Sequence, residues 1–197
     1  MPSIDVSRET TIRLQTFVEM VIAENERQNL VSPASIGDIW SRHVEDSTQL
    51  FRFREKPGEW LDIGSGAGFP GFVLALLSDD PMTLAEPRRL RADFLEYAKG
   101  VLGLGHVTVI RTTAKQLTGQ FDYVTARAVA STCEILAMTE HLIHGGTAFF
   151  LPKGRSAQSE LVEAQRSWQG EFRLERSLTS DDAAIIVARN VRRRGNR

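Results

Sequence analysis

The chain has 197 residues, of which 42% are hydrophobic and 25% charged, and its formal net charge is −1. This length and composition are ordinary for one globular domain with an appendage. The single cysteine, Cys133, excludes an internal disulfide and favours a reducing compartment. We find no apolar run of the ~20 residues that a membrane span needs and no signal-peptide core, so we expect a cytoplasmic protein. Near-neutral total charge does not indicate nucleic acid, but basic clusters at 52–56, 88–91, 153–155 and 192–197 could bind phosphates.

The first 58 residues are predicted to be helical. Apolar residues recur at helical spacing from Leu14 to Ile22, which predicts an amphipathic helix over residues 7–28. A second helix is predicted from Ser35, which could cap it together with Asp38 three residues later. Pro57-Gly58 is a turn signal and ends this segment.

The rest of the chain alternates between strands and helices. Five strands are predicted over 59–63, 82–85, 107–111, 121–126 and 147–151. Helices are predicted over 70–77, 88–102, 132–144 and 156–168, with Gly145-Gly146 closing the third of them. Two final strands, 172–178 and 183–188, are too close for a helix and should pair antiparallel.

This pattern predicts an α/β fold with a doubly wound, seven-stranded, mostly parallel sheet. We expect residues 1–58 to form a helical extension, 59–190 a Rossmann-like core, and 191–197 a basic, frayed tail.

The stretch from Trp60 to Gly71 carries the strongest functional signal, because a strand runs into a glycine-rich turn that opens a helix. Gly66-x-Gly68-x-x-Gly71 has dinucleotide-binding spacing, whereas Gly64-x-Gly66-x-Gly68 is the pattern of S-adenosylmethionine methyltransferases. Pro70 lacks the N–H that a pyrophosphate would use, and S-adenosylmethionine has no phosphate. The turn, with Ser65 inside it, therefore favours S-adenosylmethionine.

Charged residues at predicted strand ends are further candidates. Glu86 ends the second strand, 18 residues after Gly68, where an acid can accept both ribose hydroxyls of an adenosine. Asp62 could orient backbone N–H groups, face the methionine amino group, or be purely structural. Arg127 ends the fourth strand, where it could pair with the methionine carboxylate or hold RNA. His43 and Asp46 share a helical face, but two ligands do not make a metal site, so we assign them to packing or to ordering the loop near Asn29 and Ser32.

Taken together, several motifs resemble the bacterial 16S rRNA (guanine-N7) methyltransferase G family, also called glucose-inhibited division protein B. The motifs are Asn29-Leu30-Val31-Ser32, His43-x-x-Asp46-Ser47, Leu61 to Gly71, Arg91-x-x-Phe94-Leu95, Ala126-Arg127-Ala128-Val129-Ala130 and Pro152-Lys153-Gly154. The likeness runs from about Leu14 to Ala188. It implies methyl transfer from S-adenosylmethionine to N7 of a guanine in 16S rRNA.

The resemblance also implies which residues line the cofactor site: Gly64, Phe69, Ala114, Lys115 and Arg127, with Glu86 as the acid for the ribose. Ala114-Lys115 departs from the family pattern, in which many members have a small or apolar residue followed by an acid. A side-chain acceptor is therefore missing there, although the backbone could still contact adenine.

Guanine N7 has an in-plane lone pair and no proton, so the implied reaction needs alignment and exclusion of water rather than a catalytic base. Arg127 and Lys153 are possible substrate contacts, and Lys153 could reach RNA phosphate or guanine O6 or be a plain loop lysine. We expect a monomer that binds 16S rRNA or the small ribosomal subunit, with no metal and no membrane partner. Open alternatives are a small-molecule methyltransferase, a non-catalytic cofactor-sensing or RNA-binding module, and a nicotinamide oxidoreductase.

Overall fold

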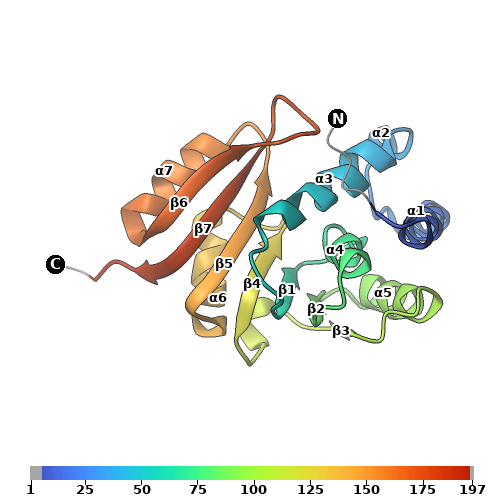
Figure 1. Cartoon of the computed structure of the whole chain (residues 1–197), viewed down its shortest axis with the longest axis horizontal. Helices are drawn as coiled ribbons and strands as arrows, with labels where there is room; N and C mark the ends of the chain where they lie inside the picture. The colour runs from blue at the N-terminus through green and yellow to red at the C-terminus, as the bar shows by residue number, and fades with distance from the viewer. Residues whose placement is uncertain (1–5, 196–197) are drawn as a thin grey trace.

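The computed structural model describes residues 6–195, which contain a seven-stranded sheet in the order β3-β2-β1-β4-β5-β7-β6 (Figure 1). β1 to β5 are parallel, and β7 pairs antiparallel with both β5 and β6. The predicted fold class and the antiparallel final pair are thus confirmed. The strands are β1 (Trp60–Ile63), β2 (Met82–Ala85), β3 (Val107–Ile110), β4 (Phe121–Ala126), β5 (Ile143–Lys153), β6 (Trp168–Arg176) and β7 (Ala184–Arg193).

Helices cover both faces of the sheet, as the alternating pattern predicts (Figure 1). One apolar cluster joins a sheet face to α1 (Arg8–Gln28), α4 (Gly71–Leu77) and α5 (Arg89–Val101). A second cluster joins the opposite face to α6 (Thr132–Thr139) and α7 (Ala157–Ser167). None of the helices within residues 6–195 is long and apolar enough to cross a membrane.

The segment after α1 differs from the single second helix that we predicted. It forms four short pieces: α2 (Pro33–Ile36), the π-helix η1 (Trp40–Glu45), α3 (Asp46–Thr48) and the 3₁₀ helix η2 (Gln49–Phe53). Ser35 does not cap a helix; its hydroxyl donates to the Ser32 carbonyl at 2.8 Å. The first piece begins earlier because Pro33 has the fixed φ of a first helical turn and no N–H to lose.

The helix predicted over 132–144 is also shorter than expected. α6 ends at Thr139, the 3₁₀ helix η4 (Glu140–Leu142) follows, and Gly145 and Gly146 lie inside β5 instead of closing a helix. The pairing register between β4 and β5 shifts here, which is where glycine is tolerated in a strand.

The basic end of the chain is more ordered than predicted. Arg192 and Arg193 belong to β7 and pair with β6, so a frayed tail from Arg192 is wrong. Arg194 also donates its backbone N–H to the Ser167 carbonyl at 2.9 Å. Residues 196–197 of the predicted tail lie outside the described residues.

Candidate functional site

The strand register brings the predicted site residues to one edge of the sheet. Ile63, the last residue of β1, is level with Ala85 at the end of β2 and Ala126 at the end of β4. The glycine-rich turn, Glu86 and Arg127 therefore leave the sheet side by side. In open α/β sheets this carboxyl edge is where ligands bind.

The turn needs its glycines. Gly64, Gly66 and Gly68 all have positive φ, at 64°, 57° and 94°. The turn is held by backbone hydrogen bonds from Gly64 N to the Ala85 carbonyl at 2.8 Å and from Gly68 N to the Ser65 carbonyl at 2.7 Å. A Cβ at Gly68 would lie 2.9 Å from the Phe17 ring, so helix α1 packs directly beneath the turn.

Glu86 has a role that the sequence did not reveal. It is buried, and its two carboxylate oxygens accept the backbone N–H groups of Gly66 and Arg88, each at 2.9 Å. Glu86 thus fixes the glycine turn to the start of α5. A carboxylate offers about four lone-pair sites, so both oxygens can still accept hydroxyl groups of a ligand.

Asp62 is the one acid of β1, and its side chain is fully buried. Within residues 6–195 neither carboxylate oxygen has a hydrogen-bond partner, and the Ser65 hydroxyl donates to the Asp62 main-chain carbonyl instead. Burial raises the pKa of Asp62 to about 7. A buried carboxyl group without a partner is costly, and a positively charged ligand above the turn would relieve that cost.

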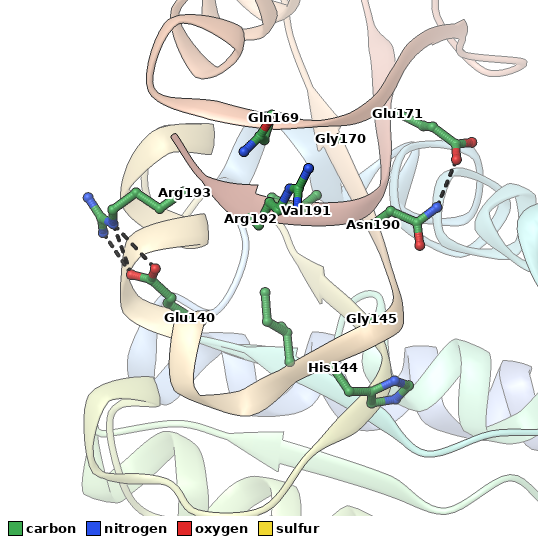
Figure 2. Close-up of a pocket in the computed structure, with 11 residues that line it drawn as sticks. Glu140, His144, Gly145, Gln169, Gly170, Glu171, Asn190, Val191, Arg192 and Arg193 are labelled. Atoms are coloured by element: carbon green, nitrogen blue, oxygen red, sulfur yellow. Dashed lines mark hydrogen bonds and ion pairs between the residues drawn. The ribbon is translucent and has the colours of Figure 1, made fainter. Parts of the chain in front are cut away.

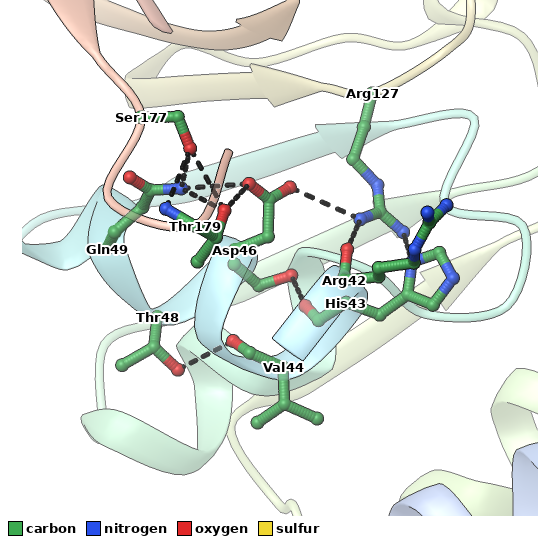
Figure 3. Close-up of polar contacts among 10 residues, drawn as sticks. Arg42, His43, Val44, Asp46, Thr48, Gln49, Arg127, Ser177 and Thr179 are labelled. Carbon is green, nitrogen blue, oxygen red and sulfur yellow. Dashed lines mark hydrogen bonds and ion pairs between the residues drawn. The ribbon is translucent and has the colours of Figure 1, made fainter. Parts of the chain in front are cut away.

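Arg127 is tied to the N-terminal segment (Figure 3). Its Nη2 donates to His43 Nδ1 at 2.6 Å, and its Nη1 donates to the Arg42 carbonyl at 3.2 Å and lies 3.5 Å from Asp46 Oδ2. Burial, Arg127 and Arg42 lower the pKa of His43 to about 4. Since a guanidinium only donates, His43 is neutral, with its proton on Nε2.

These contacts correct part of the assignment of His43 and Asp46. His43 does pack, because its ring stacks on Phe69 at 5.0 Å between centroids. Within residues 6–195 no hydrogen bond joins His43 or Asp46 to residues 29–32; in that loop Asn25 Oδ1 accepts the Val31 N–H at 2.8 Å. The contact with Arg127, 84 residues from His43, carries no signal in a single sequence.

The side chain of Lys153, the last residue of β5, is fixed by hydrogen bonds. Its side chain is 8% exposed, and Nζ donates to the Ala130 carbonyl at 2.8 Å and to Glu160 Oε2 at 2.9 Å. Glu160 also accepts the backbone N–H of Thr132 at 2.9 Å. The loop after β4 is therefore fastened to β5 and α7.

Two cavities lie at different edges of the sheet, and only one of them is at the carboxyl edge of the parallel strands. One of about 670 Å³ lies at the opposite edge, at the amino end of β5, and contains the ion pair between Arg193 and Glu140 (Figure 2). The other, of about 360 Å³, is lined by Asp46, Arg127 and Lys153. We take the smaller cavity as the candidate because ligands of this fold bind at the carboxyl edge.

The remaining predicted residues are less distinctive. Ala114 is buried and Lys115 is exposed, both in the 3₁₀ helix η3 (Ala114–Gln116) after β3. Two residues over the turn were not predicted to lie there: Arg91 Nη1 and Val129 Cγ2 lie 3.6 and 2.7 Å from ideal Cβ positions at Gly66 and Gly64. Within residues 6–195 no three His, Cys, Asp or Glu side chains are grouped to hold a metal.

The sheet order, the glycine turn after β1 and the acid after β2 define a class I methyltransferase. Solved structures with this fold include ribosomal protein L11 methylase from Lactobacillus delbrueckii subsp. bulgaricus, with a TM-score of 0.60 and 15% identity over 77% of each chain. TYW2 from M. jannaschii in complex with AdoMet has a TM-score of 0.59 and 13% identity over 77% of this chain and 76% of that one.

Relatives and the family model narrow the class. Ribosomal RNA small subunit methyltransferase G of Rhizorhabdus wittichii is 44% identical over 96% of this chain and 90% of its own length. The enzyme of that name from Zymomonas mobilis is 40% identical over 95% and 89%. The family model for rRNA small subunit methyltransferase G matches residues 11–186. The chain belongs to this family.

Proposed function

We propose that this protein transfers the methyl group of S-adenosylmethionine to N7 of a specific guanine in 16S rRNA. The family match over residues 11–186 is the observation that carries the proposal. The proposal further places the protein in the cytoplasm, acting as a monomer on 16S rRNA or the small subunit.

The cofactor site is assigned to residues at the carboxyl edge of β1 to β4. The assigned residues are Gly64, Ser65, Gly66, Gly68, Phe69, Glu86, Ala114, Lys115 and Arg127. Bound S-adenosylmethionine supplies a methyl group on a positively charged sulfur. The carboxyl group of Asp62, which has no hydrogen-bond partner within residues 6–195, fits a ligand with that charge. Glu86 retains acceptor capacity for the ribose hydroxyls.

The remaining work of the protein is to position guanine and exclude water. The bond from guanine N7 to the methyl carbon would form, with the lone pair of N7, as the bond from that carbon to sulfur breaks. S-adenosylhomocysteine would leave as a neutral thioether and the base would take up the positive charge, so no side chain has to remove a proton. Lys153 is assigned to the substrate, and Arg127 to the substrate as well as to the cofactor site, since both side chains line the cavity of about 360 Å³. Residues 6–58 act as a helical extension of the 59–190 core, and residues 1–5 of the predicted extension 1–58 lie outside the described residues. Exposed arginines such as Arg52, Arg88 and Arg192 contact RNA phosphates.

The decisive experiment uses ribosomal RNA from a strain that lacks this gene. Purified protein with S-adenosylmethionine should restore one 7-methylguanine, located by mass mapping of RNA fragments. Binding of the cofactor without methylation of RNA, subunits or assembly intermediates would instead support a cofactor-sensing module. A small-molecule methyltransferase would require a closed, apolar pocket, whereas this cavity is lined by two acidic and two basic side chains.

A further inference from the structure

We propose that the cavity bounded by Asp46, Arg127 and Lys153 is the pocket for the target guanine, and that Asp46 distinguishes guanine from adenine. Asp46 would accept hydrogen bonds from N1–H and the exocyclic amino group, while Lys153 donates to O6. This inference rests on the proposed function and adds to it the residues that read the base.

The cavity has the right place and size for a single base. It opens beside the loop after β4 and the end of β5, and the guanidinium of Arg127, which lines it, lies 5.5 Å from the centroid of the Phe69 ring in the glycine turn. Its volume of about 360 Å³ is near the lower end of the ~300–1,000 Å³ of small-molecule sites, which suits one extruded base. Small or apolar residues, among them Ala130, Pro152 and Ala183, form much of the wall and offer flat contact to a purine.

Asp46 lines this cavity, and one of its two carboxylate oxygens has only a single long contact within residues 6–195. Its Oδ1 already accepts from Gln49 Nε2 at 2.8 Å and from the Thr179 hydroxyl at 2.9 Å (Figure 3). Its Oδ2 has one long contact, 3.5 Å to Arg127 Nη1. A carboxylate has about four lone-pair sites, so Oδ2 can accept another donor without breaking the contacts of Oδ1.

Lys153 offers the complementary donor. Two of its three N–H groups are used by the Ala130 carbonyl and Glu160, which leaves one for a ligand in the cavity that Lys153 lines. Glu160 also lines the cavity, but we do not assign it a hydrogen bond to the base. Its Oε2 serves Lys153 and Thr132, and its Oε1 accepts from the Ser156 hydroxyl at 2.8 Å.

A carboxylate beside a lysine matches the hydrogen-bonding groups on the Watson–Crick edge of guanine. Guanine presents an acceptor at O6 beside donors at N1 and N2, which matches a lysine beside a carboxylate. Adenine presents an amino group where guanine has O6 and an unprotonated N1, so both protein groups would face the wrong partner. Holding O6 and N1 in this way leaves N7, on the other side of O6, free to attack.

The test compares Asp46→Asn and Lys153→Met with wild type by two separate measurements. Calorimetry gives the affinity for S-adenosylmethionine, and methylation of small-subunit RNA from the deletion strain gives kcat/KM. Each variant should lower kcat/KM about 10- to 100-fold, the worth of one specific base contact, with unchanged cofactor affinity. The matched control for the acid is Asp38→Asn, whose side chain is 64% exposed and pairs with Arg42 outside the cavity; it should methylate like wild type.

A pocket-filling variant tests the location without touching the polar network. Ala183→Trp should abolish methyl transfer and preserve cofactor binding, whereas Leu178→Trp, on the same β6–β7 hairpin and exposed, should change neither.

Wild-type methyl transfer by the Ala183→Trp protein would overturn the proposal that the guanine binds in this cavity. If Asp46→Asn lowers cofactor affinity by the same factor as kcat/KM, then Asp46 acts through Arg127. That result would overturn the proposal that Asp46 recognises the guanine base. If wild type itself fails to methylate the RNA, the proposed function fails; if wild type is active and the variants match it, only this inference fails.

Discussion

The buried carboxyl group of Asp62 makes the stability of the protein depend on pH in a way that one substitution can isolate. Asp62→Asn keeps the shape of the side chain and removes its titration. Because the Asp62 side chain is fully buried and unpartnered within residues 6–195, the wild-type protein must either hold it protonated or bury a charge. The D62N side chain faces no such choice.

The size of the effect follows from the pKa. Burial raises the pKa of Asp62 from 3.8 to about 7. In the unfolded chain the group ionises near pH 4, so its contribution to the free energy of unfolding is complete below pH 4 and is lost as the pH rises through 7. The difference corresponds to about 4 kcal/mol. Relative to wild type, the D62N protein should therefore gain up to about 4 kcal/mol between pH 4 and pH 8.

Urea unfolding of both proteins at several pH values measures this difference. Asp38→Asn provides the control, since it makes the same chemical change at a side chain that is 64% exposed and leaves Asp62 in place. A D62N protein whose difference from wild type does not change between pH 4 and pH 8 would refute the reasoning. If Asp62 also faces the cationic cofactor, binding near pH 7 should release a proton, which calorimetry in buffers of different ionisation enthalpy detects.

Three further predictions concern other parts of the site and its support, and Gly103→Ala serves as the control for the first of them. Gly68→Ala, at φ 94° and with its Cβ within 3 Å of two phenylalanine rings, should lose about 2–5 kcal/mol of unfolding free energy. The control is Gly103→Ala, at φ 63° with no atom within 4 Å of its ideal Cβ, which should lose only about 1–2 kcal/mol of unfolding free energy. If urea unfolding gives the same loss for both variants, the glycine turn is not closely packed against the phenylalanine rings. Asp80→Ala leaves the largely buried Arg54 guanidinium without its acceptor at 2.6 Å and should cost about 3–5 kcal/mol in thermal or urea unfolding; a cost below about 1 kcal/mol would mean that water satisfies the arginine. Glu86→Ala frees the glycine turn and should weaken cofactor binding at least ~10-fold by calorimetry, and unchanged affinity would remove Glu86 from the site.

The alternation of strands and helices was predictable because each strand or helix after Pro57 carries its own period and its own turn residues. Residues 33–53 were not, because the spacing of apolar residues there fits one helix as well as four short pieces. The two glycines after His144 look like a helix stop, yet they accommodate a shift of register between β4 and β5 that only the paired strands reveal.

Some features of the candidate site could likewise be predicted from the sequence, and others could not. The glycine turn, Glu86 and Arg127 were found because each is placed by a strand end, and strand ends of a parallel sheet meet at one edge. The neutral state of His43 and the unpartnered carboxyl group of Asp62 depend on burial and on residues far along the chain. Such features are set by tertiary packing, which local pattern does not record.

The hydrogen bonds between Asp46 and Thr179 and between Gln49 and the Leu178 backbone join segments from opposite ends of the chain. During translation Asp46 and Gln49 emerge first, and Leu178 and Thr179 follow them only after a further 129 residues or more have been made. The cavity therefore closes only after the β6–β7 hairpin has been made. A prematurely terminated product that retains the whole glycine turn would still lack the wall contributed by Ser177 and Ala183 to Ile185.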